Sequence, residues 1–235
     1  RHRGRAQRAP VPAVAGKSRL RLAVYQAATR TWSPARDAIE LDGDYALAAG
    51  PGNLIALLGC THDTLSLVES TDAGVTWGKP VTINQPAKTT PRTPALEFLA
   101  DGRLLAAWTF ETAAGDAGLH ALVASRHALG ADHLIEARVS PGSAPALVAF
   151  PDGGALVVYR GRSENGVQDI RTARFNDNAW PPPTTLISDL WKPASAPMDG
   201  PALAARGPHL AAAWFTGADG TSVQVMTRER KFSGT

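Results

Sequence analysis

The sequence predicts an all-β protein with the architecture of a β-propeller, assembled from four-stranded antiparallel blades. The composition favours this class, because 18 Pro and 22 Gly in 235 residues, without long helical patterns, indicate many short strands joined by turns. A hairpin pattern recurs about every 50 residues, and the segments that follow it recur in the same phase. Four-stranded sheets repeated in this way are typical of a propeller. A β-sandwich competes with this prediction, but it does not require the same four-strand phase to recur.

The first and second strands of each blade come from a hairpin with a shared sequence. Each copy begins Pro-Ala-Leu, breaks at a turn and ends on an apolar strand that an aromatic residue closes. Asp-Gly between two apolar runs is a strong hairpin signal, and the apolar strands indicate a central position that is buried on both faces. The copies span Pro94–Trp108, Pro145–Tyr159 and Pro201–Trp214, with turns at Asp101-Gly102, Asp152-Gly153 and Arg206-Gly207-Pro208, and Tyr45–Gly59 is a looser fourth copy.

The third and fourth strands of each blade follow the hairpin. A tryptophan shortly before a proline leads into the fourth strand at Trp32, Trp77 and Trp180. The copy near residues 125–130 keeps a Ser and a Gly but has lost the Asp and the Trp of the turn, and Asn176-Asp177-Asn178 is a shortened turn. The third strands are expected at residues 66–70, 120–125, 167–174 and 222–227.

The repeat is incomplete at both ends. Residues 18–40 match the third and fourth strands of an earlier blade, and residues 201–232 supply about three strands of a last one. The count is therefore four and a half to five blades. An irregular five-bladed ring that pairs the N-terminal hairpin with the C-terminal strands is an alternative. We expect a propeller domain over residues 18–235 after a basic, disordered tail over residues 1–17.

The charge of the chain is concentrated in this tail, whose first ten residues hold four arginines and no acid. Removing that +4 from the formal net charge of +3 leaves −1 for the remainder, so nucleic acid is not an expected partner. No apolar run approaches the roughly 18 residues that cross a membrane. No signal peptide is visible in the sequence.

Neither a metal site nor a cofactor is predicted. Cys60 has no second cysteine to join it and lies in an apolar run, so we expect a buried structural thiol. His120, His127 and His133 are close in sequence, but nothing makes them face one another. The motifs of zinc proteases, P-loops and dinucleotide-binding folds are absent from the sequence.

One turn carries a motif of its own, Ser70-Thr71-Asp72-Ala73-Gly74-Val75-Thr76-Trp77, which reads S-x-D-x-G-x-T-W. The Asp72 carboxylate can accept hydrogen bonds from backbone N–H groups that a turn leaves unpaired. Gly74 can adopt a positive φ, and the hydroxyls of Ser70 and Thr76 can bond across the turn. Trp77 is expected to start the next strand and to bury its ring between strands. These residues are predicted to have a structural role.

This pattern resembles the Asp box, or BNR motif, of sialidase-type β-propellers. The segment from Tyr159 to Arg171 is similar to one found in bacterial exo-α-sialidase-like proteins. The segment from Ala196 to Ala202 is similar to their Cys-Pro-x-Asn-Gly-Pro-Ala stretch, with Ala196 in place of the Cys and Asp199 in place of the Asn. The likeness covers about residues 40–235. It implies six blades, so that about one blade lies outside this sequence, and a secreted protein in the extracellular space or the periplasm.

The ligand-binding candidates lie where the loops between second and third strands converge on one face. Other candidates on that face are Arg92, Glu111, Asp116, the segment 61–63 and the pair Trp191-Lys192. The turn at residues 70–77 lies at the opposite side. The main candidates are Arg160, Arg162, Glu164, Asp169 and Asp199.

The catalytic residues of a sialidase cannot be assigned in this sequence. The resemblance implies three arginines that clamp a substrate carboxylate, a Tyr nucleophile activated by Glu, and an acid/base Asp. No Arg-Ile-Pro occurs near the start, and only Arg160 is offered as a clamp residue, with an exposed strand-end arginine or one paired with Glu164 or Asp169 as the simpler interpretation. Tyr159 takes the repeat position of Trp108, so it is interpreted as a packing residue.

Two functions therefore stay open. The first is a non-catalytic, sialidase-like propeller that binds a glycan or a protein, such as a glycoprotein, on its loop face without a cofactor. The alternative is an exo-acting glycoside hydrolase of the sialidase type with part of its active site outside this chain. The sequence does not determine the oligomeric state.

Overall fold

The computed structural model describes residues 18–41, 43–84, 89–126, 128–220 and 222–229, and within these ranges the secondary structure consists of β-strands without a helix. The N-terminal strands form two small sheets. Strand β1 (Ser18–Leu22) pairs with β4 (Arg36–Leu41), and β2 (Tyr25–Gln26) pairs with β3 (Thr31–Trp32). This part contains the expected outer strands of an earlier blade. The predicted tail at residues 1–17 lies outside the described residues.

Four larger antiparallel sheets follow, which we name blades A to D. Blade A has four strands, blade B has five because two short strands share the outer edge, blade C has four and blade D has three. Blade A comprises β5 (Tyr45–Ala49), β6 (Ile55–Thr61), β7 (Thr64–Ser70) and β8 (Val81–Thr82); blade B comprises β9 (Thr89–Phe98), β10 (Leu104–Thr112), β11 (Ala117–Ser125), β12 (Ala128–Leu129) and β13 (His133–Glu136); blade C comprises β14 (Ala146–Ala149), β15 (Ala155–Arg160), β16 (Ile170–Phe175) and β17 (Thr184–Ile187); blade D comprises β18 (Ala202–Arg206), β19 (His209–Thr216) and β20 (Ser222–Glu229).

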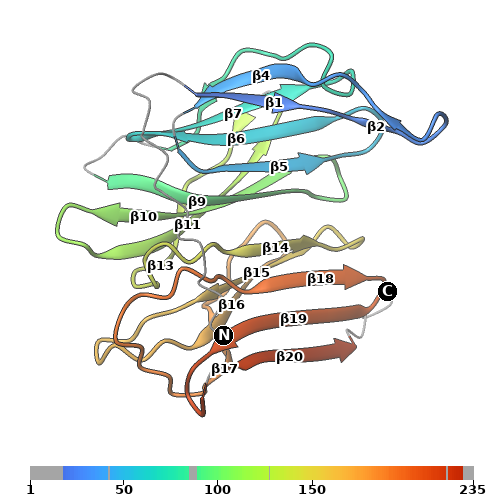
Figure 1. Ribbon diagram of the computed structural model, residues 1–235. Coiled ribbons are helices and arrows are strands. Elements are labelled where there is room, and N and C mark those ends of the chain that lie inside the picture. The colour runs from blue at the N-terminus through green and yellow to red at the C-terminus, as the bar shows by residue number, and fades with distance from the viewer. Residues whose placement is uncertain (1–17, 42, 85–88, 127, 221, 230–235) are drawn as a thin grey trace, which may run out of the picture.

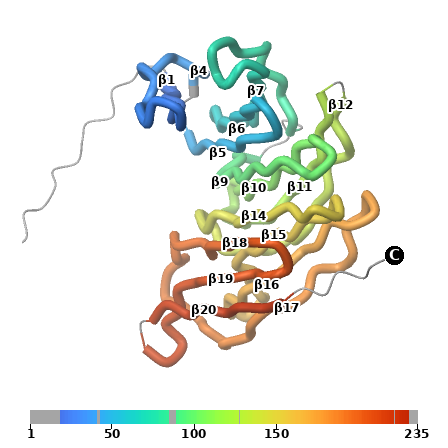
Figure 2. The backbone as a smooth tube through the Cα atoms, turned by 90° about the vertical axis from the view of Figure 1, so that its right-hand side faces the viewer, coloured from blue at the N-terminus to red at the C-terminus, as the bar shows by residue number. Residues whose placement is uncertain are grey.

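The blades stand face to face in chain order, with their first strands side by side. Strand β5 lies next to β9, and β14 lies next to both β9 and β18. Both views place β1 and β4 at one end of this arc and blade D at the other (Figures 1 and 2). The structure confirms the predicted β-propeller class. It does not pair β1 or β4 with β18–β20, as the five-bladed alternative would require.

The predicted hairpin turns form as the sequence indicates. Gly102 and Gly153 have φ values of +83° and +82°, a region that glycine enters without steric cost. The amide of Gly102 donates to Leu99 O at 2.9 Å, and that of Gly153 donates to Phe150 O at 3.0 Å. The Asn176-Asp177-Asn178 turn also joins a third strand to a fourth, with both Asp177 and Asn178 at positive φ.

Within the described ranges, the hydrophobic core consists of three clusters, one at each junction between adjacent blades A to D. Side chains of the second strand face both neighbours alternately, as expected for a strand buried on both faces. In blade B, for example, Ala106 and Trp108 face blade A, whereas Leu105 and Ala107 face blade C. Cys60 lies in the first cluster, which confirms the predicted buried thiol.

Two details differ from the predictions. Trp77 does not start a strand, because the chain stays irregular through Pro80, which has no N–H to donate, and β8 begins only at Val81. The strands of blade D are not buried on both faces. Val223 and Val225 on β20 are 68% and 67% exposed, since no described strand covers that face of the last blade.

We expect the junction between blades to carry much of the stability. Leu105 is fully buried at the junction of blades B and C. Leu105→Ala should lower the free energy of unfolding by about 2–5 kcal/mol, as a large-to-small change in a packed core does. Val225→Ala, on the exposed face of blade D, should change it by less than about 0.5 kcal/mol. Denaturant unfolding of both variants measures these changes in the free energy of unfolding. An equal loss in the two variants would contradict the expected role of the junction.

Candidate functional site

The predicted loop face is formed by the connections between second and third strands. These are residues 61–64 in blade A, 112–117 in blade B, 160–170 in blade C and 216–222 in blade D. The turn at residues 70–77 joins the third and fourth strands of blade A, and so lies at the other end of the antiparallel sheet. The loop face and this turn are therefore on opposite sides, as the sequence indicated.

A polar cavity of about 440 Å³ opens on the loop face between blades B and C. Four of its lining residues are charged, with two arginines and two carboxylates. Arg162, Glu164 and Asp116 were predicted for this face, whereas Arg138 and Ser163 were not. The lining residues are Asp116, Ala117, Arg138, Val139, Arg162, Ser163 and Glu164.

The backbone fixes the two walls of this cavity against each other. Val139 forms an isolated bridge with Gly161, and the amide of Arg162 donates to Arg138 O at 3.0 Å. The amide of Val139 donates to Ala117 O at 2.9 Å, which ties the same segment to blade B. Arg138 is therefore held across from Arg162 by main-chain contacts. No sequence motif marks Arg138, because it lies in a connection between blades.

The next turn closes the wall that carries Glu164. The amide of Ser163 donates to Val167 O at 2.8 Å, and the Ser163 hydroxyl accepts from the amide of Val167 at 3.0 Å. Gly166, with φ of +79°, allows this reversal. Glu164 thus lies on a closed turn rather than on a loose loop.

The charges in the cavity are only partly compensated. Arg138 Nη1 donates to Glu164 Oε1 at 2.6 Å. This pairing lowers the pKa of Glu164 and raises the pKa of Arg138. The exposed side chain of Arg162 makes no hydrogen bond or ion pair within the described ranges. Arg162 is therefore able to bind a ligand without first breaking an ion pair.

Arg160 lies two residues before Arg162, but its side chain is buried, whereas the side chain of Arg162 is exposed. Arg160 is 1% exposed, its Nη2 donates to Phe215 O of blade D at 2.6 Å, and its guanidinium lies 5.0 Å from the centroid of the Trp191 ring. Burial lowers the pKa of Arg160, while the nearby carboxylates of Asp189 and Asp199 oppose this. The interpretation as an exposed strand-end arginine, or as one paired with Glu164 or Asp169, is wrong, because the buried side chain turns into the junction of blades C and D.

The two predicted aspartates lie apart from the cavity. Asp169 accepts hydrogen bonds from the Ser188 hydroxyl at 3.3 Å, and its backbone oxygen accepts from the amide of Gly161. Asp199 is exposed, and its backbone oxygen accepts from the Ser143 hydroxyl at 3.4 Å. The structure therefore brings together Arg162 and Glu164 but not Asp169 or Asp199. The last two stay predictions as ligand-binding residues.

Tyr159 is a packing residue, as the repeat predicted. It is 1% exposed in the cluster between blades B and C, and its hydroxyl donates to Glu136 Oε2 at 3.2 Å. Glu136 also forms an ion pair with Arg171, 3.0 Å from its Nε. Burial and the charge of Glu136 raise the pKa of Tyr159. A raised pKa disfavours the phenolate, so this Tyr–Glu pair lacks the character of an activated nucleophile.

The remaining candidates make local contacts. Arg92 Nε lies 3.9 Å from Glu111 Oε2, and His62 occupies the β6–β7 turn with φ of +50°. His120 Nδ1 lies 2.5 Å from Asp132 Oδ1, and its ring stacks on Trp108. Among the described residues, no group of three or more His, Cys, Asp or Glu side chains could hold a metal ion.

The turn at residues 70–77 is held by the hydrogen bonds that its sequence suggests. Asp72 Oδ1 accepts from the Thr76 amide at 2.8 Å, and Oδ2 accepts from the Thr76 hydroxyl at 2.6 Å. The Ser70 hydroxyl donates to Asp72 at 2.8 Å and accepts from the Gly74 amide at 2.8 Å. Gly74 has φ of +79°. All these bonds lie inside the turn, which supports the predicted structural role.

No protein-family model matches this sequence, and neither does any curated protein. Solved structures do share its fold. A protein of unknown function from Dyadobacter fermentans has a TM-score of 0.59 and 16% identity, covering 81% of this chain and 54% of that one. Xylan beta-1,4-xylosidase from Bacillus halodurans has a TM-score of 0.50 and 13% identity, covering 82% and 42%. The alpha-L-arabinanase of Penicillium chrysogenum, complexed with arabinobiose, has a TM-score of 0.50 and 14% identity, covering 78% and 61%.

These likenesses show the fold, which is a β-propeller of the kind found among glycosidases. They do not single out the sialidase family, so that resemblance stays a prediction. The chain spans about half the length of the solved structures that it matches. No helix among the described residues is long and apolar enough to cross a membrane.

We expect Asp72 to make stability depend on pH in acid. Hydrogen bonds from Thr76 and Ser70 lower the pKa of Asp72 to about 2. Because this pKa lies below the unfolded value, the stabilisation is complete above about pH 4 and is lost as the pH falls through about 2. Melting temperatures measured over this range should therefore fall more steeply for the wild type than for Asp72→Asn. A wild-type slope for Asp72→Asn would contradict this.

We expect Arg160 chiefly to stabilise the packing of blade C against blade D. Arg160→Ala removes a charged hydrogen bond and a contact with Trp191, and should cost about 2–4 kcal/mol of unfolding free energy. Arg160→Lys should recover part of this loss, because an ammonium can still reach Phe215 O. Arg162→Ala, two residues away, should cost less than about 0.5 kcal/mol. Denaturant unfolding distinguishes the three variants. A loss of less than about 0.5 kcal/mol in the unfolding free energy of Arg160→Ala would argue against this stabilising role.

Proposed function

We propose that the protein is a sialidase-like propeller that binds a glycan in the loop-face cavity between blades B and C. One observation carries the proposal, namely the convergence of Asp116, Arg138, Arg162 and Glu164 on one polar cavity. Sugar hydroxyls both donate and accept hydrogen bonds. Carboxylates accept them, and arginine guanidinium groups donate them in a fixed planar geometry. The propeller fold, which this chain has in common with glycosidases, supports the same class of ligand.

In this proposal Arg162 makes the principal contact. Its guanidinium has no partner among the described residues, so it can bind a ligand oxygen without losing an existing ion pair. Glu164 and Arg138 form an ion pair at the rim of the cavity. Asp116 supplies a further hydrogen-bond acceptor from blade B. Arg160 supports the cavity from behind by holding the strand end that leads into Arg162. The proposal extends to an extracellular or periplasmic location, which fractionation of the source cells would test.

The binding test compares two exposed arginines. A glycan array, followed by calorimetric titration of the best ligand, should give binding that Arg162→Ala weakens about 10-fold or more, the loss expected for a charge-assisted hydrogen bond. Arg206→Ala, at a hairpin turn on the opposite side, should leave the affinity unchanged. Equal affinity of wild type and Arg162→Ala would contradict the proposal, and so would an array without a single bound glycan.

The alternative is a glycoside hydrolase whose active site is completed by residues outside this chain. It is favoured by two solved structures that share this fold, a xylosidase and an arabinanase, of which the chain covers only part. The buried Tyr159 with its raised pKa weighs against a tyrosine nucleophile. Hydrolysis of nitrophenyl xylosides, arabinosides or sialosides above a blank, lost in Glu164→Gln, would favour this alternative over simple binding.

A further inference from the structure

A largely apolar cavity of about 530 Å³ lies between blades C and D. Side chains of β15 and β16 form one wall, and side chains of β18, β19 and β20 form the other. It shares no lining residue with the loop-face cavity between blades B and C. Pockets that bind small molecules measure roughly 300–1,000 Å³ and are mostly apolar with a few placed polar groups. This second cavity therefore has the size and the character of a small-molecule site.

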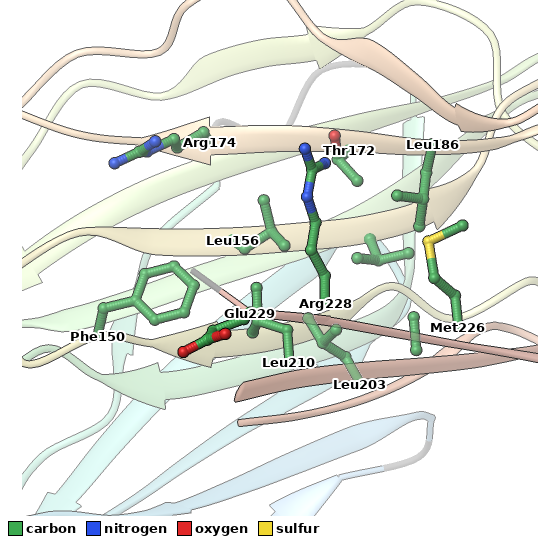
Figure 3. Close-up of a pocket in the computed structure, with 12 residues that line it drawn as sticks. Phe150, Leu156, Thr172, Arg174, Leu186, Leu203, Leu210, Met226, Arg228 and Glu229 are labelled. Atoms are coloured by element: carbon green, nitrogen blue, oxygen red, sulfur yellow. The ribbon is translucent and has the colours of Figure 1, made fainter. Parts of the chain in front are cut away.

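The cavity is charged where it meets solvent and apolar further in. Arg174 and Arg228 border it and are exposed, whereas Val158 and Ala212 in its wall are 0% and 7% exposed. Figure 3 shows the side chain of Arg228 extending across the cavity toward Thr172. A ligand that fills this space therefore contacts a cation at one end and hydrocarbon at the other.

The two arginines are not neutralised by the part of the chain that the structure describes. Within residues 18–229, apart from the positions left undescribed, their guanidinium groups make no hydrogen bond or ion pair. One carboxylate is among the lining residues, that of Glu229, and Figure 3 shows it pointing away from the Arg228 guanidinium. An uncompensated cation beside apolar surface attracts an anion, because its charge is screened less there than in bulk water.

Thr172 offers a second polar contact beside Arg228. Its hydroxyl oxygen lies 3.1 Å from that of Thr184, and either hydroxyl can donate this hydrogen bond. When Thr184 donates it, the hydroxyl proton of Thr172 is available to a ligand oxygen. A guanidinium and a hydroxyl that donate side by side suit the two oxygens of a carboxylate.

The junction between blades B and C shows that this charge is particular to blades C and D. There Val123 and Phe175 pack in the apolar cluster, with the ring of Phe175 5.2 Å from that of Trp180. The strand registers place Arg174 and Arg228 at the corresponding positions of the next junction. Two apolar packing residues of the repeat are thus replaced by arginines at one junction. Such a local departure from the packing pattern is expected at a functional site.

We propose that this cavity binds a medium-chain alkyl carboxylate. The carboxylate accepts hydrogen bonds from Arg228 and Thr172, and the chain lies against the aliphatic side chains of Leu156, Val158 and Met226. The arginine selects an anion, and the apolar walls select a hydrocarbon chain. This site is independent of the proposed glycan site, because the two cavities have no residue in common.

Calorimetric titration with sodium hexanoate, octanoate and decanoate, each below its micelle-forming concentration, tests the proposal. Octanoate buries two more methylenes than hexanoate and should bind about 10-fold more tightly. The uncharged octan-1-ol should bind to the wild type at least about 10-fold more weakly than octanoate, because it lacks the charge-assisted hydrogen bonds. Arg162→Ala, in the loop-face cavity, should leave the affinity for octanoate unchanged.

Protein variants locate the bound carboxylate. Arg228→Gln should weaken octanoate binding about 10-fold or more and leave octan-1-ol binding unchanged, since it removes the charge but keeps a polar side chain. The matched control Arg206→Gln, at a hairpin turn of the same blade, should keep the wild-type affinity for octanoate. Leu210→Trp fills the cavity and should abolish octanoate binding, whereas Val223→Trp, on the other face of the sheet, should not.

Three results would overturn the proposal. The first is the absence of saturable decanoate binding up to ~1 mM, the limit of millimolar affinity. The second is equal affinity of the wild type for octanoate and octan-1-ol. The third is wild-type affinity of Arg228→Gln for octanoate. If Leu210→Trp fails to fold, Arg228→Gln still decides the question, because it changes only an exposed side chain.

Discussion

The structure depends on the burial of both faces of each central strand. A single antiparallel sheet can bury only one face by itself, so β6, β10 and β15 each need a neighbouring sheet on either side. The core is accordingly divided into clusters at the junctions, and no blade has a core of its own. Blade D has one such neighbour among the described residues, and its strands are correspondingly exposed. The exposed valines of β20 follow from the missing neighbour on the other face of this blade.

The need to bury both faces of the central strands also places the candidate site at the junction between two blades. Side chains within the central strands pack in the core. Side chains of the loops beyond the strand ends remain accessible to a ligand, while the strands hold these loops in place. Arg160 and Arg162 illustrate the difference over two residues. Arg160 ends β15 and is drawn into the junction with blade D, where Phe215 and Trp191 hold it. Arg162 lies just beyond the strand and faces solvent, and backbone bonds to the Arg138 segment keep it in place.

Much of the fold could be predicted because its signals are local and repeated. The Asp-Gly turns, the apolar hairpins and the incomplete first and last blades were all expected where they occur. The Ser70–Trp77 turn also has the predicted bonds, since its partners lie within six residues of one another. The site was predicted less well. Arg162, Glu164 and Asp116 line one cavity on the face where they were expected, but Asp169 and Asp199 lie elsewhere, and Arg138 carries no motif that could have indicated it.

The repeat, the strand order within each blade and the chemistry of the turns could all be predicted from the amino-acid sequence alone. These depend on backbone conformation and on pairing between neighbouring strands, which short stretches of sequence encode. Which charged side chains are buried, and which of them meet, depends on how the blades pack against one another. Arg138 and Glu164 are 26 residues apart, and Arg160 and Phe215 are 55 apart. Contacts over such separations arise when whole blades pack face to face, and the spacing of residues within one blade does not reveal them.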